Sequence, residues 1–139
     1  MTTKKHTATL LILMFLGLTG LAHAQMETTI KAQVPFNFVA NGETMPADEC
    51  TIRFMVNGRT TLSISSGKQH TFAFPIADES SNGSKKTALV FHRYGDRYFL
   101  SGVEREGRMS YQLRPSGVEK ELRAQNLSVQ EFTLLASVE

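Results

Sequence analysis

The stretch Leu89-Val90-Phe91-His92-Arg93-Tyr94-Gly95-Asp96-Arg97-Tyr98-Phe99-Leu100 decides the fold. It consists of two aromatic-rich runs that flank a Gly-Asp pair, which is the pattern of a tight β-hairpin. A two-residue loop with glycine first is typical of a type II′ turn. Such a loop sets these cross-strand pairs: Tyr94 with Arg97, Arg93 with Tyr98, His92 with Phe99, and Phe91 with Leu100. We therefore predict a hairpin that is buried at its base, exposed at its tip and central to the sheet.

The tip of this hairpin is the candidate ligand-binding site. Its residues are His92, Arg93, Tyr94, Arg97 and Tyr98. Two guanidinium groups beside two tyrosines can hold a carboxylate, a phosphate or the face of a sugar. The alternative is structural: Arg93 lies on Tyr98, and Arg97 lies on Tyr94. Each such cross-strand pair contributes about 0.2–1 kcal/mol to stability.

Apolar residues alternate with polar ones in several other short segments, the pattern of strands with one buried face. The segments are residues 30–38, 50–55, 62–64, 72–76, 109–113 and 132–138. Together with the hairpin they indicate about seven strands. The sequence predicts a mainly β protein, a single antiparallel β-sandwich or small open barrel with one short helix near the C-terminus.

Glycines and prolines divide these strands. Asn41-Gly42 is a turn signal, and Pro35 and Pro75 indicate sheet edges, bulges or strand ends. Between residues 50–55 and 62–64 we predict a three-residue loop, Val56-Asn57-Gly58, with Gly58 left-handed. A loop of this length keeps the apolar residues of both strands on the same face of the sheet. That loop sets Ile52 opposite Leu62 and Cys50 opposite Ile64. The polar segment 78–86 is predicted to be a mobile loop.

The predicted helix follows Pro115. Ser116 and Glu119 have the spacing of a capping box, and Asn126 is the expected end.

The N-terminus has the pattern of a signal peptide. Lys4 and Lys5 precede an uncharged apolar run, and Ala22-His23-Ala24 supplies the small-x-small pattern of a cleavage site. The apolar run of about fourteen residues is shorter than the roughly 20 that a spanning helix needs, which disfavours a membrane anchor. We expect a signal peptide at residues 1–24 and a single exported β domain at 25–139, periplasmic or extracellular, with no membrane span.

Charge and cysteine content exclude several classes of protein. Without Lys4 and Lys5, 13 of the 15 basic residues remain against 13 acidic ones, so the exported domain is neutral. A neutral domain is not expected to bind nucleic acid or an anionic membrane surface. Cys50 is the only cysteine, which excludes an internal disulfide. It lies on the same face of its predicted strand as the apolar residues, so we expect a buried side chain rather than a reactive thiol.

Chemical motifs do not indicate an enzyme. Two histidines and one cysteine remain after export, too few for a structural zinc site of the usual kind, and no spacing supports a metal or cofactor. The acidic pairs Asp78-Glu79 and Glu104/Glu106 fall in predicted loops, where solvated charge is the expected state.

The same segments carry a family resemblance. The stretches 34–38, 45–52 and 89–100 resemble those of small exported proteins of unknown function that are abundant in Acidobacteria. That family shows a Val-Pro-Phe-Asp-Phe motif, a Leu-Pro-Ala-Gly-Glu-Tyr-Thr-Val motif and a phrase close to His-Arg-Tyr-Gly-Asp-Arg-Tyr-Phe-Leu. Here Asp48 and Cys50 depart from the second motif. The resemblance implies export and a common fold, and no active site.

The sequence thus leads to three hypotheses of function. The first is a non-catalytic binding or structural module of the cell envelope, with an envelope partner or small ligand at the hairpin tip. The second is a carrier of a small apolar ligand, which requires a cavity of a few hundred Å³. The third, a hydrolase, requires a nucleophile and a base within about 3 Å of each other in a cleft.

Overall fold

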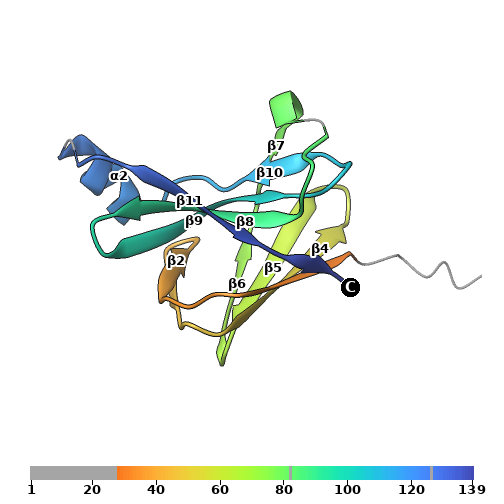
Figure 1. The fold of residues 1–139 in the computed structure, drawn as a ribbon, viewed down its shortest axis with the longest axis horizontal. Coiled ribbons are helices and arrows are strands. Elements are labelled where there is room, and N and C mark those ends of the chain that lie inside the picture. The colour runs from red at the N-terminus through yellow and green to blue at the C-terminus, as the bar shows by residue number, and fades with distance from the viewer. Residues whose placement is uncertain (1–27, 82, 126) are drawn as a thin grey trace, which may run out of the picture.

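The protein is described by a computed structural model that covers residues 28–139 except 82 and 126. The predicted signal peptide (1–24) and the predicted helix end at Asn126 therefore lie outside the described residues. The described residues form two β-sheets and one short α-helix near the C-terminus (Figure 1). This confirms the mainly β fold class predicted from the sequence.

The first sheet has five strands and is antiparallel throughout. In spatial order they are β12 (Ser137–Val138), β1 (Thr29–Gln33), β4 (Glu49–Val56), β5 (Thr60–Ser66) and β6 (Gln69–Ala73).

The second sheet has seven strands and is built around the predicted hairpin. Its main path is β11 (Gln130–Leu135), β8 (Ala88–Tyr94), β9 (Arg97–Glu104), β10 (Ser110–Gln112) and β7 (Ile76–Asp78). Two further strands, β2 (Phe38–Ala40) and β3 (Glu43–Met45), form a hairpin whose first strand runs parallel to β9. The 3-10 turn η1 (Glu79–Ser81) follows β7, and helix α2 (Gly117–Ala124) follows β10.

The described residues thus contain twelve strands rather than about seven. The chain crosses between the sheets inside three predicted strands, and strand β3 was not predicted. Segment 30–38 divides into β1 and β2 around Pro35, and segment 72–76 divides into β6 and β7 around Pro75. Segment 132–138 divides into β11 and β12 at Ala136. Apolar alternation continues through each crossing, so the sequence pattern did not reveal the change of sheet. Val34, for example, is fully buried between two strands.

The predicted register of the central hairpin is confirmed. Tyr94 pairs with Arg97, Arg93 with Tyr98, His92 with Phe99, and Phe91 with Leu100. Gly95 has φ +60°, as the first loop position of a type II′ turn requires. Beyond these pairs an irregularity at Val90/Phe91 shifts the register.

The loop between β4 and β5 differs in position from the prediction. It has three residues with Gly58 left-handed (φ +73°), as predicted, but it starts one residue later, because Val56 pairs with Thr60. The pairs are therefore Ile52 with Ile64 and Cys50 with Ser66. A register shift of two residues leaves every side chain on the same face of the sheet. The pattern of apolar residues therefore could not reveal this shift.

Side chains from both sheets fill the core between them. The largest fully buried ones include Phe38, Phe91, Ile30, Ile52 and Leu62. Cys50 is also fully buried, and burial raises the pKa of its thiol to about 12. Cys50 therefore packs as a small hydrophobic residue, as the sequence indicated.

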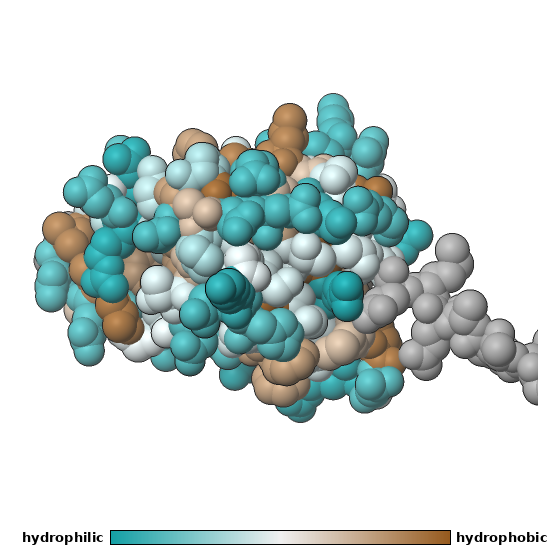
Figure 2. Space-filling model, turned by 90° about the horizontal axis from the view of Figure 1, so that it is seen from below, coloured by the Kyte–Doolittle hydropathy of each residue, from teal (hydrophilic) through white to brown (hydrophobic). Residues whose placement is uncertain are grey.

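The apolar residues of segment 72–76 are exposed. Phe72, Phe74 and Ile76 are each about half exposed, and Thr71 and Ala73 occupy the inward positions of β6. The face that they were predicted to share is divided, because Phe72 lies on β6 and Ile76 on β7, which belong to different sheets. The side of the molecule seen in Figure 2 is mostly hydrophilic, with hydrophobic side chains in separate small patches. In the described part of the chain, no helix is long and apolar enough to cross a membrane.

Candidate functional site

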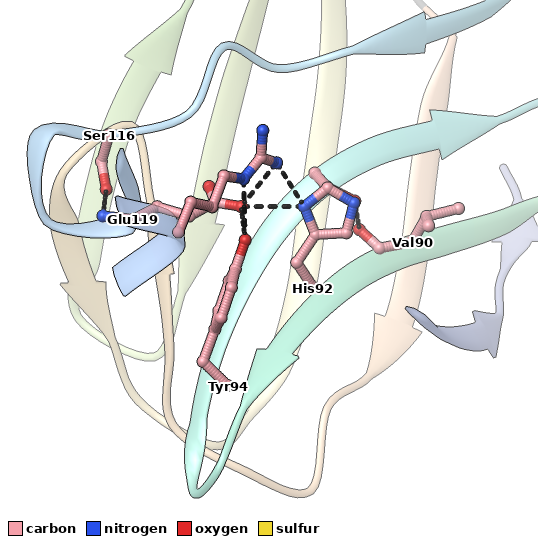
Figure 3. Close-up of polar contacts among 7 residues, drawn as sticks. Val90, His92, Tyr94, Ser116 and Glu119 are labelled. Atoms are coloured by element: carbon pink, nitrogen blue, oxygen red, sulfur yellow. Dashed lines mark hydrogen bonds and ion pairs between the residues drawn. The ribbon is translucent and has the colours of Figure 1, made fainter. Parts of the chain in front are cut away.

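Helix α2 brings two charged residues to the outer face of the central hairpin. Ser116 caps the helix, because its Oγ accepts a hydrogen bond from the backbone N–H of Glu119 at 3.2 Å. Glu119 and Arg123 are one turn apart and so lie on the same side of the helix. That side faces β8, where His92 and Tyr94 project from the hairpin (Figure 3).

The four side chains form one hydrogen-bonded cluster, which we call the Glu119 cluster: His92, Tyr94, Glu119 and Arg123. Oε1 of Glu119 lies 2.8 Å from His92 Nδ1, and the Tyr94 hydroxyl donates to it at 3.2 Å. Arg123 donates from Nη2 to the same oxygen at 3.1 Å and from Nε to Tyr94 at 2.8 Å. Only 3 % of Glu119 is exposed, so the cluster replaces the water that its carboxylate lost on burial.

The electrostatics of the cluster favour an ionised Glu119. Burial alone would raise the pKa of this carboxyl group. The hydrogen bond and charge of His92, with Arg123 and Tyr94, outweigh burial and lower the pKa of Glu119 below its ordinary value of 4.5. In return, the hydrogen bond with Tyr94 and the charge of Glu119 raise the pKa of Arg123. The cluster therefore joins helix α2 to strand β8 through hydrogen bonds that involve the charged side chains of the helix.

The other candidate tip residues contact the hairpin itself. The Arg93 guanidinium lies over the Tyr98 ring at 5.4 Å, as the structural alternative required, and Nε donates to the Gly95 carbonyl at 2.7 Å. Tyr98 in turn stacks on Phe36, with ring centroids 3.7 Å apart. The tip therefore does not present its five candidate residues to one ligand, since Arg93 and Tyr98 lie on the opposite face from His92 and Tyr94.

The prediction that Arg97 lies on Tyr94 was wrong, because Arg97 contacts another ring. Arg97 lies over the Phe99 ring at 5.5 Å, while the Tyr94 side chain lies under helix α2 and is 3 % exposed. Glu119 and Arg123 of the helix bind its hydroxyl.

Sequence reasoning missed Glu119 and Arg123 as site residues. Their i,i+4 spacing was visible, but it indicates only a pair on one helix face. Nothing in the sequence joined that face to His92, which is 27 residues away along the chain.

Beside the cluster, the outer face of the seven-stranded sheet carries a groove of about 300 Å³. Val90 and Gly102, paired across β8 and β9, line the groove. A Cβ added to Gly102 would come within 3.8 Å of the Val90 Cβ and 3.1 Å of the Tyr111 carbonyl oxygen. The missing side chain of Gly102 thus keeps the groove open. At one end the groove reaches His92 and Arg123.

The other end of the groove holds a buried hydroxyl. Ser110 is 4 % exposed, and its Oγ has no hydrogen-bond partner in the described part of the chain. Ser110 is paired with Asp78 across β10 and β7, and both line the groove with Glu104. Buried polar side chains are nearly always hydrogen-bonded, so an unpartnered one marks a position where a ligand atom is expected.

A second serine meets the distance set for a hydrolase but not the surroundings. Ser63 Oγ and His70 Nε2 are 2.9 Å apart on the outer face of the five-stranded sheet. His70 is exposed, and neither residue lines the groove. Among residues 28–139, apart from 82 and 126, no three His, Cys, Asp or Glu side chains lie close enough to hold a metal ion.

Comparisons of the chain with protein-family models, curated proteins and solved structures found no match. The site must therefore be interpreted from its own geometry.

Proposed function

We propose that the protein is an exported, non-catalytic binding module of the cell envelope, and that it binds a small polar ligand in the groove. The observation that carries this proposal is the buried Ser110 hydroxyl, which has no hydrogen-bond partner among the described residues and lies in a groove kept open by Gly102. Export rests on the signal-peptide pattern of residues 1–24.

The position and volume of the groove support this function. Its volume of about 300 Å³ lies at the lower end of the range for small-molecule sites. The groove lies on the outside of the sheet, where Ser101, Ser110 and Gln112 line it, while side chains of both sheets pack between the sheets. This arrangement favours a polar ligand over the apolar cargo of a barrel carrier.

The Glu119 cluster defines one end of the groove. His92 and Arg123 belong to both the cluster and the groove lining, so the cluster holds two groove side chains in fixed positions. Preorganised side chains lose less entropy on binding, which favours a binding role for this face.

The experiment is an NMR titration of the ¹⁵N-labelled protein with sugars, amino acids, polyols and amines. We expect at least one compound to shift the amide signals of Val90, Gly102 and Ser110. Val90→Phe narrows the groove and should abolish those shifts. Thr61→Phe, at a half-buried position on the other sheet, is the matched control. Shifts that never fall on the groove, or that survive Val90→Phe, would contradict the proposed function.

A further inference from the structure

The two ends of the groove differ in charge. Glu104 and Asp78 line one end, and Arg123 lines the other beside His92. Glu104 is paired with Ala88, four residues before His92 on β8. At the usual rise of a strand, the ends are about 13 Å apart. A small molecule can therefore contact both ends at once.

At the acidic end, neutral side chains donate hydrogen bonds to both carboxylates. The Ser84 hydroxyl donates to Glu104 at 3.3 Å. Asp78 accepts hydrogen bonds from Ser80 and, at 2.8 Å, from the Gln112 amide. Neutral donors orient a carboxylate without cancelling its charge. The Ser110 hydroxyl beside them has no partner among the described residues and can accept a hydrogen bond.

The basic end carries little net positive charge. Arg123 is paired with buried Glu119 at 3.1 Å, so its charge is largely compensated. Glu131, which is exposed and paired with His92 across β11 and β8, adds another carboxylate to the lining. Among the described residues, the salt bridges involve neither Glu104 nor Glu131. The groove as a whole is thus negative and favours a cation.

We infer that the groove binds a small organic cation, a primary amine, with its ammonium group between Glu104, Ser110 and Asp78. This inference rests on the proposed function and names the ligand class of the same groove. An ammonium group offers three donors, which match two carboxylates and one hydroxyl. The rest of the ligand runs over Gly102 toward Arg123, whose outward N–H groups donate to its oxygen atoms.

The test compares amines with neutral molecules of the same shape. Glucosamine is compared with glucose, and putrescine with 1,4-butanediol, by isothermal titration calorimetry and by NMR. We expect at least one amine to bind about tenfold more tightly than its neutral counterpart, since hydrogen bonds to charged groups are the stronger ones. Added salt should weaken this binding.

Two variants test the position of the ammonium group. Glu104→Gln keeps the shape of the side chain and should remove most of the preference for the amine, and Ser110→Ala should weaken amine binding severalfold. Glu106→Gln, an exposed carboxylate outside the groove, is the matched control and should change nothing. Thermal unfolding of each variant shows whether it is folded.

Three outcomes would overturn the inference: neither amine binds, each amine binds no better than its neutral counterpart, or the preference survives in folded Glu104→Gln. These outcomes are separate from failure of the proposed function. A neutral ligand that shifts the groove signals would retain the groove as a binding site and remove the ammonium position.

Discussion

Two histidines in the described part of the chain make short hydrogen bonds to side chains, and their surroundings differ. His70 Nε2 lies 2.9 Å from Ser63 Oγ on an exposed strand face. His92 Nδ1 lies 2.8 Å from Glu119, a carboxylate that is 3 % exposed and also binds Tyr94 and Arg123. Similar distances thus describe different interactions: water can replace the first, while the second joins helix to sheet. Burial and the number of partners, rather than distance, identify the important contact.

The largest effect is expected from removal of the shared carboxylate. Glu119→Ala leaves His92, Tyr94 and Arg123 without their common acceptor, and we expect it to lower the free energy of unfolding by about 2–4 kcal/mol. Urea unfolding measures this change. Glu121→Ala, at an exposed position on the same helix, should cost less than about 0.5 kcal/mol. Equal costs for the two variants would show that the cluster does not hold the helix to the sheet.

The two histidines can be compared directly. His92→Ala should destabilise the protein by about 1–2 kcal/mol, because Glu119 loses a partner in a buried setting. His70→Ala should cost less than about 0.5 kcal/mol, because water replaces the imidazole. Both values come from the same urea experiment. A cost for His70→Ala that matches or exceeds that for His92→Ala would refute the distinction between them.

The pH dependence of stability gives a smaller effect. Because the pKa of Glu119 is lower in the folded protein than its ordinary 4.5, ionised Glu119 stabilises the fold above that value. This stabilisation is lost as the pH falls below 4.5 and through the lowered pKa. We expect a steeper loss of stability in acid for the natural chain than for Glu119→Gln. Parallel curves for the two proteins would mean that the cluster does not lower this pKa.

The smallest effect is expected for the exposed serine. Ser63→Ala removes the hydroxyl that approaches His70, and we expect a change in stability within about 0.5 kcal/mol. Ester hydrolysis, measured with p-nitrophenyl acetate, should be the same for the variant and the natural chain. Loss of a measurable esterase activity in Ser63→Ala would support the hydrolase hypothesis instead.

The thiol of Cys50 extends the contrast between buried and exposed groups. Its pKa of about 12 leaves almost no thiolate at pH 8, so a disulfide reagent such as 5,5′-dithiobis(2-nitrobenzoic acid) should react only after unfolding. Reaction at the rate of a free thiol in the folded protein would contradict its full burial.

Local features were predictable from the sequence. The register of the central hairpin followed from its two-residue Gly95-Asp96 loop, and the helix start from the spacing of Ser116 and Glu119. The burial of Ile30, Ile52 and Cys50 followed from the alternation of apolar and polar residues along their strands. Each of these features depends on neighbours within a few residues or on a tight turn, so short-range patterns determine them.

Only the tertiary structure decided where these parts meet. Crossings at Pro35, Pro75 and Ala136 distribute single apolar segments over two sheets. In residues 30–38 the alternation continues through the crossing because both sheets bury their side chains in one core. The groove depends on the pairing of Val90 with Gly102, which the sequence did not reveal.

The two kinds of information meet in the hairpin itself. The sequence by itself determined which residues oppose one another next to the hairpin loop, because a two-residue loop leaves a single register there. The packing of α2 decided that His92 and Tyr94 bind Glu119 rather than form a ligand site at the hairpin tip. The sequence did not show this, because 27 residues separate His92 from that carboxylate and no local pattern spans such a distance.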